Sequence, residues 1–201
     1  MTSMNIPGKR KLELNSLLKL LAALILAAAI VVFTYCASFA HVQEIIEAKD
    51  SSDIFRTFEL DTLDGGKMNA SELRNSRLVV VNIWGTDCPP CIKELPDLAA
   101  LSNEYDPKDL RVIGIPRDVD PAGKSTFESR LKEARRIISV TGVTFTNLIP
   151  DAEMEDFIKA SVIGTPTTFL LDQEGNVIET MIGGKPISVL KSLIGEHLGG
   201  N

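Results

Sequence analysis

A nearly continuous apolar run at residues 78–84 (LVVVNIW) limits the possible folds more than any other segment of the sequence. Such a run, rich in β-branched residues, is typical of a strand that is covered on both faces, as in the middle of an α/β sheet. It leads after three residues into Cys88-Pro89-Pro90-Cys91, and apolar side chains follow at helical spacing. We therefore expect a buried strand, then a turn, then a helix that begins at the two cysteines.

The rest of the pattern alternates strands with helices. Further strands are expected at residues 56–60, 111–117, 144–148, 167–172 and 177–182, and helices at 70–74, 125–140, 152–160 and from 186 to about 198. The last two strands are joined by residues 173–176 (QEGN), which are typical of a hairpin turn. This order predicts an α/β fold with a central mixed β-sheet flanked by helices on both faces.

The spacing of Cys88 and Cys91 allows their sulfur atoms to meet across the first turn of the expected helix. Unpaired N–H groups and the positive end of the helix dipole favour a thiolate there. We expect Cys88 to be the more exposed nucleophile and Cys91 to be the shielded cysteine that resolves a mixed disulfide. Pro89 and Pro90 fit the first helical turn, where a missing N–H costs little, and they stiffen the loop.

A metal site could also use two cysteines at this spacing. However, a structural zinc site needs four ligands, and the sequence offers only His41, His197 and one further cysteine, Cys36. Cys36 lies in an apolar segment, where it is expected to be a small apolar residue. We therefore expect no metal and no cofactor. An inert structural disulfide remains an alternative, although it would not need a place at the start of a helix.

An uncharged apolar segment covers residues 20–40 and is preceded by four cations between Lys9 and Lys19. About 20 apolar residues in a helix span the hydrocarbon core of a bilayer. Cations ahead of such a span stay in the cytoplasm, which sends the rest of the chain to the outer side. A signal peptide cleaved after Ala40 is the alternative, and it would export the domain as well.

These features divide the chain into three parts: a cytoplasmic basic stub with a transmembrane anchor at residues 1–40, a tether at 41–55 and a folded domain at 56–201. Residues 1–40 carry a net charge of +3, which leaves −9 for the rest of a chain whose total is −6. A nucleic-acid partner would require a basic face to bind phosphates, so the acidic domain argues against one.

Two segments, VVVNIWGTDCPPCIKELPDL and VIGTPTTFLLDQEGNVIETMIGG, resemble the TlpA/ResA-like family of membrane-anchored extracytoplasmic thioredoxin-fold thiol–disulfide oxidoreductases. The resemblance covers roughly residues 55–198. It implies a thioredoxin-like fold with an inserted helix and strand at about 119–149. It also implies that Pro166, after Thr165, is a cis-proline that faces the dithiol and borders the substrate-binding edge.

The resemblance also assigns roles to single residues. Glu94 matches a family acid near the dithiol that handles protons; alternatively, it is a solvated carboxylate on the helix surface. Asp87 stands where the family usually has tryptophan. A carboxylate beside Cys88 would disfavour its thiolate, and no cation lies between Arg77 and Lys93 to offset it. The residues expected to contact substrate are Trp84, Pro89, Pro90, Thr165 and Pro166.

The function implied is a disulfide reductase that acts on exported disulfide-containing proteins, with apocytochrome c as the family's best-known substrate. Such an enzyme would receive electrons from a thiol carrier in the membrane and be held there by its N-terminal helix. Two alternatives stay open: an oxidase that forms disulfides with the same residues, and a redox-inert binding or copper-handling module.

Overall fold

The computed structural model describes residues 16–32, 53–123 and 125–199. The chain divides into two compact units, Met1–Asp50 and Ser51–Asn201.

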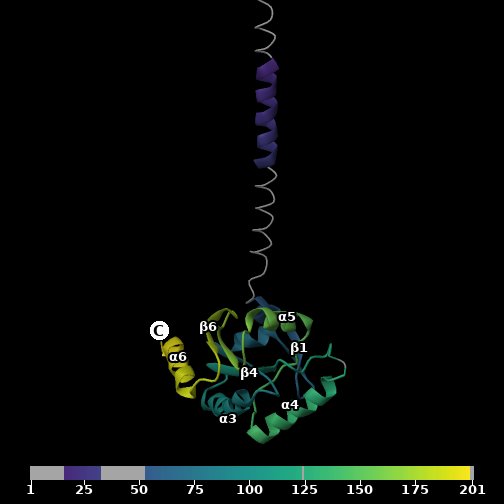
Figure 1. The fold of residues 1–201 in the computed structure, drawn as a ribbon. Helices are drawn as coiled ribbons and strands as arrows, with labels where there is room; N and C mark the ends of the chain where they lie inside the picture. Colours follow the sequence, from purple (N-terminus) through teal and green to yellow (C-terminus); the bar gives the residue numbers. More distant parts are fainter. Residues whose placement is uncertain (1–15, 33–52, 124, 200–201) are drawn as a thin grey trace, which may run out of the picture. The chain divides into compact units, whose positions relative to one another are not determined.

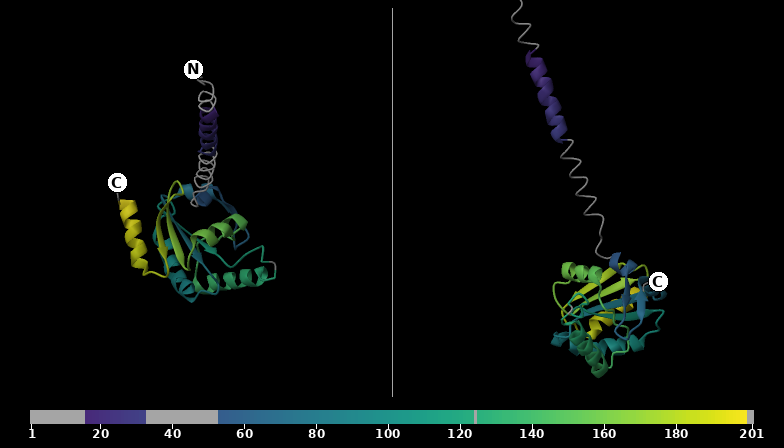
Figure 2. Two further views of the ribbon diagram at one scale, coloured as in Figure 1. Left: turned by 45° about the horizontal axis from the view of Figure 1, so that its top comes forward. Right: turned by 90° about the vertical axis from the view of Figure 1, so that its right-hand side faces the viewer.

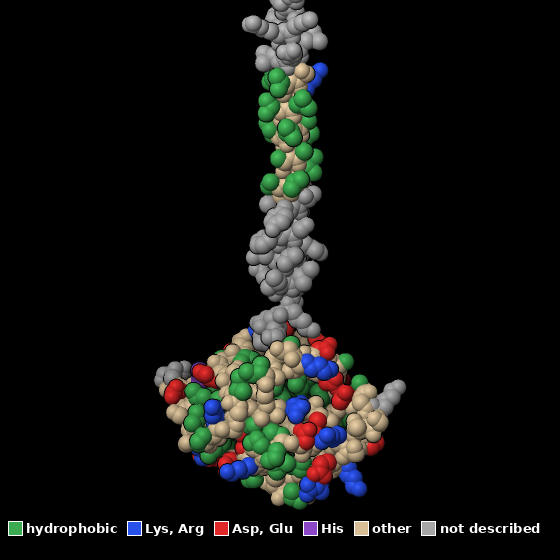
Figure 3. Space-filling model, in the orientation of Figure 1, with side chains coloured by type: hydrophobic (Ala, Val, Ile, Leu, Met, Phe, Trp, Pro, Cys, Tyr) green, Lys and Arg blue, Asp and Glu red, His purple; other side chains and the backbone are tan. Residues whose placement is uncertain are grey.

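In the first unit, residues 16–32 form a helix whose Leu, Ile and Val side chains are exposed. Figure 3 shows hydrophobic side chains along its visible side. The apolar span expected at residues 20–40 lies partly outside the described residues, as do Cys36 and most of the expected tether. Within the described ranges, no helix combines the length and the apolar character needed to cross a membrane.

The second unit is built on a mixed sheet of four strands in the order β4-β3-β5-β6. The strands are β3 (Leu78–Trp84), β4 (Leu110–Pro116), β5 (Thr167–Asp172) and β6 (Val177–Ile182). β3 pairs with β4 in parallel, and the β3–β5 and β5–β6 pairs are antiparallel. A separate antiparallel ladder joins β1 (Glu59–Asp61) to β2 (Lys67–Asn69).

Helices lie on both sides of this sheet (Figures 1 and 2). They are α2 (Ile54–Thr57), the 3₁₀ helix η2 (Ala70–Asn75), α3 (Pro89–Glu104), α4 (Phe127–Thr141), α5 (Ala152–Ser161) and α6 (Ile187–Gly199). Two hydrophobic clusters fill the space between helices and sheet. One includes side chains of α3, α4 and α6, and the other includes side chains of α2, η2 and α5.

Strand β3 supplies side chains to both clusters, because successive side chains of a strand point to opposite faces. Leu78, Val80 and Trp84 belong to the cluster with α3, whereas Val79 and Val81 belong to the cluster with α5. Every position of β3 is buried. The central place of this strand explains its nearly continuous apolar sequence.

The strand expected at residues 56–60 is wrong at its start. Residues Ile54–Thr57 form helix α2, and strand β1 begins at Glu59. Ile54, Phe55 and Phe58 are all buried, and their spacing is that of one helical face. The expected segment began at Arg56, so it missed the first half of this pattern.

The strand expected at residues 144–148 forms only isolated bridges, Thr62 to Leu148 and Gly114 to Asn147. The backbone of this segment forms hydrogen bonds with two neighbouring segments. Leu148 N–H donates to the Gly114 carbonyl of β4, while Leu63 N–H donates to the Asn147 carbonyl from the β1–β2 connection. The segment inserted at about 119–149 therefore contains the expected helix, α4, without a full strand after it.

Candidate active site

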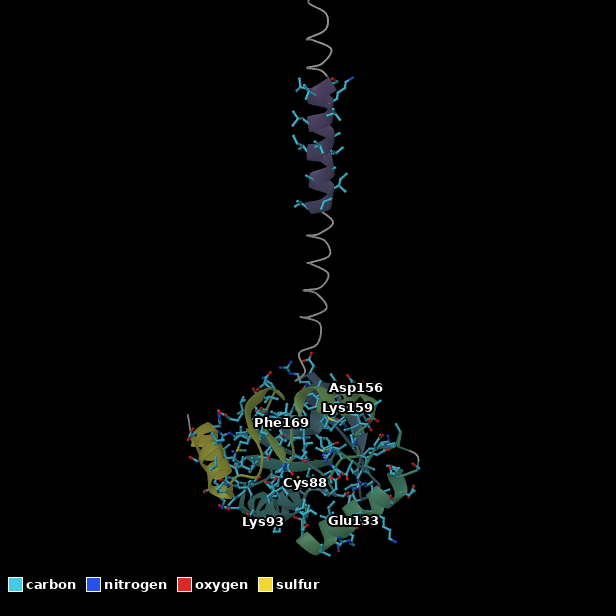
Figure 4. The ribbon with its side chains drawn as sticks, in the orientation of Figure 1. Cys88, Lys93, Glu133, Asp156, Lys159 and Phe169 are labelled. Atoms are coloured by element: carbon cyan, nitrogen blue, oxygen red, sulfur yellow. A yellow bond between two sulfur atoms is a disulfide. The ribbon has the colours of Figure 1, made fainter. Side chains whose placement is uncertain are left out.

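Cys88 and Cys91 form a disulfide at the start of α3, with Cα atoms 5.3 Å apart. Cys88 is the N-cap of this helix, and Pro89 and Pro90 occupy its first positions. Cys91 is fully buried, whereas Cys88 keeps 7% of its surface exposed. Figure 4 labels Cys88 where the sheet meets α3. Of the two cysteines, Cys88 is thus the one that a substrate can reach.

The loop before β5 lies against this disulfide. The Thr165–Pro166 peptide bond is cis, as the resemblance implied, and the Thr165 carbonyl oxygen is 3.6 Å from Cys88 Sγ. Ile163, two residues before Thr165, is 84% exposed. The structure therefore brings Thr165 to Cys88 and places an exposed apolar side chain close by in the same loop, which the sequence analysis missed.

Pro89 and Pro90 are exposed at the start of α3, as a contact surface for a substrate requires. The loop after β6 approaches them. A Cβ atom at Gly184 would lie 4.0 Å from Pro90 Cβ and 3.8 Å from Glu94 Oε2. The exposed surface at the start of α3 is thus bordered by the loop that contains Gly184.

Trp84, expected among the substrate-contacting residues, is fully buried. Its indole Nε1 donates a hydrogen bond of 2.9 Å to Asn147 Oδ1, and Asn147 Nδ2 in turn donates to the Phe145 carbonyl. In the disulfide state the side chain has no surface to offer a substrate. The structure gives it a packing position instead, because β3 is covered on both faces.

Glu94 is half-buried on α3, and its Oε1 accepts a hydrogen bond of 2.8 Å from Asn82 Nδ2. Burial raises the pKa of Glu94 to about 7; the hydrogen bond from Asn82 opposes the rise, and the negative charge of Asp97 adds to it. Asn82 Nδ2 also donates to Thr168 Oγ1, while its buried Oδ1 has no hydrogen-bond partner within the described part of the chain. Glu94 is not a freely solvated carboxylate, and near neutral pH it can accept or release a proton.

The expectation that no cation offsets Asp87 is wrong. Arg117 Nη2 lies 3.2 Å from Asp87 Oδ1, and Arg130 Nη2 lies 3.9 Å from Asp87 Oδ2. Arg117 follows β4 and Arg130 belongs to α4, so neither is close to the cysteines in sequence. A search restricted to residues between Arg77 and Lys93 could not find them.

No metal site accompanies the disulfide in residues 16–32, 53–123 and 125–199, where no group of three or more His, Cys, Asp or Glu side chains is placed to hold an ion. His197 lies 3.8 Å from Glu179, and His41 is outside the described residues. The chemistry that this arrangement can perform is thiol–disulfide exchange at Cys88.

Comparisons with known proteins agree with this geometry. Residues 48–194 of the chain match the family described as Redoxin. The thiol-disulfide oxidoreductase ResA of Bacillus thuringiensis (strain Al Hakam) is 27% identical over 173 residues, which cover 83% of this chain and 87% of that protein. The ResA of Bacillus subtilis (strain 168) is 26% identical over 175 residues, which cover 87% of each.

Solved structures show the same architecture. A thiol:disulfide interchange protein of the thioredoxin family from Chlorobium tepidum TLS superposes with a TM-score of 0.60 at 21% identity, over 72% of this chain and 94% of that one. At this level of identity the similarity bears on the fold alone. The second unit therefore has the expected thioredoxin-like fold, with a mixed sheet between two layers of helices.

Proposed function

The chain belongs to the Redoxin family, and we propose that within this family it is an extracytoplasmic disulfide reductase that acts on exported proteins through Cys88 and Cys91. Its reaction class is thiol–disulfide exchange, so it is a thiol–disulfide oxidoreductase. The observation that carries the proposal is the disulfide at the start of α3, in which Cys91 is fully buried and Cys88 keeps 7% of its surface exposed.

In the proposed reaction, the thiolate of reduced Cys88 attacks one sulfur of a substrate disulfide and forms a mixed disulfide. The other substrate sulfur leaves as a thiolate and takes up a proton. Cys91 then loses its proton, attacks Cys88 Sγ and releases the second substrate thiol. Two electrons have passed to the substrate, and the enzyme holds the Cys88–Cys91 disulfide seen in the structure.

Glu94 is the proposed acceptor of the Cys91 proton. It lies one helical turn after Cys91, and its pKa of about 7 leaves it partly ionised at neutral pH. Cys91 is fully buried in the disulfide state, which favours a group within the protein as the acceptor of its proton. Release of the proton from Glu94 to solvent would complete the cycle.

The direction of the reaction is tested by the reduction potential. Dedicated oxidases have potentials of about −120 mV, whereas reducing thioredoxins have potentials of about −270 mV. We expect a potential in the lower part of this range, measured by equilibrating the full chain with thiol buffers and quantifying its free thiols. A value near that of the oxidases would make the chain a disulfide-forming enzyme.

Reduction of insulin disulfides by the purified chain with dithiothreitol tests whether the dithiol is active at all. We expect the reaction to require both Cys88 and Cys91. A chain that reduces nothing would instead be a redox-inert binding or copper-handling module.

Apocytochrome c is the proposed substrate among exported proteins, because the resemblance to ResA-like proteins implies it. Its haem-attachment site is a Cys-x-x-Cys-His segment, which exchanges disulfides when it is oxidised. An oxidised peptide with this motif should be reduced faster than insulin under the same conditions. A slower rate would direct the search to other exported proteins.

We also propose that residues 1–40 anchor the chain in the membrane, that residues 41–55 form a tether and that residues 56–201 form the catalytic domain outside the cytoplasm. The order of cations and apolar residues supports the orientation. A membrane thiol carrier would then reduce the Cys88–Cys91 disulfide back to the dithiol, and the anchor would keep the domain close to this carrier.

A further inference from the structure

Helix α4 contacts the loop that precedes Cys88 through a set of short polar contacts. The Thr86 backbone N–H donates to both carboxylate oxygens of Asp118, at 3.0 and 3.2 Å, and the Thr86 hydroxyl donates to Asp118 Oδ2. Arg130 of α4 donates to Thr86 Oγ1 at 2.7 Å and pairs with Asp118 Oδ2 at 3.0 Å. Thr86 is 7% exposed, so these contacts are largely shielded from water.

The same arginine reaches the residue next to Cys88. Arg130 and Arg117 both approach Asp87, whose side chain is half exposed. We call Asp87, Arg117, Asp118 and Arg130 the charge cluster. It contains two carboxylates and two guanidinium groups, so its net charge is zero, and Thr86 and Asp87 immediately precede Cys88.

Helix α4 is attached to the domain through apolar side chains as well as through the charge cluster. Leu131, Ala134 and Ile137 of this helix are buried in the hydrophobic cluster that also contains α3 side chains. The ion pairs that Arg117 and Arg130 form with the half-exposed Asp87 add little to stability. The cluster also contacts the loop before Cys88, because Asp118 accepts from the Thr86 backbone N–H and both arginines lie near the Asp87 carboxylate.

We propose that Arg130 is a positioning residue through which α4 sets the stability of the Cys88 thiolate, by holding the Thr86 loop and by cancelling the negative charge of Asp87. The inference rests on the proposed thiol–disulfide exchange at Cys88. It assigns a role in that reaction to the inserted helix, which supplies no residue to the disulfide itself.

Glu94 and Asp97 of α3 and Lys185 after β6 line a separate groove that contains none of the charge cluster. The loop with Thr165 presents a carbonyl oxygen to Cys88. Substitutions in the charge cluster therefore change the field at Cys88 without removing these groups.

The proposal predicts shifts of opposite sign. Arg130→Met leaves a net negative cluster, which should destabilise the thiolate and raise the pKa of the Cys88 thiol by roughly half a unit, about a threefold loss of thiolate at a pH below that pKa. Asp87→Asn leaves a net positive cluster and should lower the pKa by a similar amount. The double variant restores neutrality and should return close to the original value.

The measurement is the pH dependence of iodoacetamide alkylation at Cys88 in the reduced full chain, read by peptide mass spectrometry so that Cys36 does not interfere. Arg136→Met is the matched control, since Arg136 is also on α4 but pairs with Glu133. It should not change the pKa of Cys88. Arg130→Lys keeps the charge and should leave the pKa of Cys88 close to that of the parent chain.

Unchanged alkylation in Arg130→Met, or double-variant values that do not return toward the original, would overturn the proposal. Neither result depends on turnover. Failure of the proposed function would appear separately, as a lack of insulin reduction or an oxidase-like potential in the unsubstituted chain.

Discussion

The two cysteines differ in burial. Cys91 has no exposed surface, whereas part of Cys88 is exposed beside the Thr165 carbonyl. We therefore expect Cys88 to form the first bond with a protein substrate and Cys91 to break it.

Cys91→Ala should therefore accumulate mixed disulfides with an oxidised protein substrate, because the resolving thiol is missing. Cys88→Ala should accumulate few, since its remaining thiol is buried. Non-reducing electrophoresis after incubation of each variant with oxidised insulin measures the adducts, and the double variant is the control. Equal trapping by both single variants would contradict the assignment.

The burial of Glu94 makes the stability of the fold depend on pH. Its pKa rises from 4.5 to about 7 because burial penalises the charged form. When the pKa of a carboxyl group is higher in the folded than in the unfolded chain, its protonation stabilises the fold. This stabilisation is complete below the unfolded-state pKa and is lost as the pH rises through the folded-state pKa. The loss falls between about pH 4.5 and pH 7.

Glu94→Gln should remove this dependence, because glutamine does not ionise. Between pH 5 and pH 8, the free energy of unfolding of the oxidised Glu94→Gln chain should fall by about 1–2 kcal/mol less than that of the oxidised parent chain. This magnitude allows for the partial exposure of Glu94. Denaturant unfolding at the two pH values measures it. Glu128→Gln, at an exposed position of α4, is the control and should retain the loss.

Among the elements, β4 is held to its neighbours through a glycine. At Gly114, a Cβ atom would overlap the Asn147 side chain and lie 3.1 Å from Trp84 Nε1. Gly114 N–H also donates to the Thr146 carbonyl. This glycine lets the segment after α4 pack directly on the strand that leads to Arg117.

Gly114→Ala should destabilise the domain by about 1–3 kcal/mol, because a methyl group is forced into a packed site. Thermal unfolding followed by circular dichroism measures the effect. Gly195→Ala in α6 is the matched control, since a Cβ atom there meets nothing within 4 Å and alanine favours a helix. A Gly114→Ala variant as stable as the control would mean that Asn147 moves aside freely.

For the whole chain, the proposed anchor makes a prediction about location. The full chain should stay in the membrane fraction after a high-salt wash, and protease added to intact cells with a permeable wall should digest the domain. The same domain behind a cleavable leader is the control and should be recovered in the soluble exported fraction. Recovery of the unaltered chain as a soluble protein starting near His41 would favour cleavage instead.

Three elements could be predicted from the amino-acid sequence alone: the strand Leu78–Trp84, the helix that starts at the cysteines and the hairpin of β5 and β6. These features depend on residues that are close together in the sequence, so hydrophobic periodicity and turn residues predict them. The motif likewise identified Cys88 and Cys91, because two residues between cysteines is itself a local geometry.

The surroundings of these two cysteines, in contrast, depend on tertiary packing. Arg117 pairs with Asp87 from 30 residues away, and Asn147 binds Trp84 from 63 residues away. Three features depend on which segments pack together: the charge compensation of Asp87, the burial that raises the pKa of Glu94, and the isolated bridges in place of a full strand at residues 144–148. Such contacts join residues that are far apart in the sequence, so no local sequence pattern predicts them.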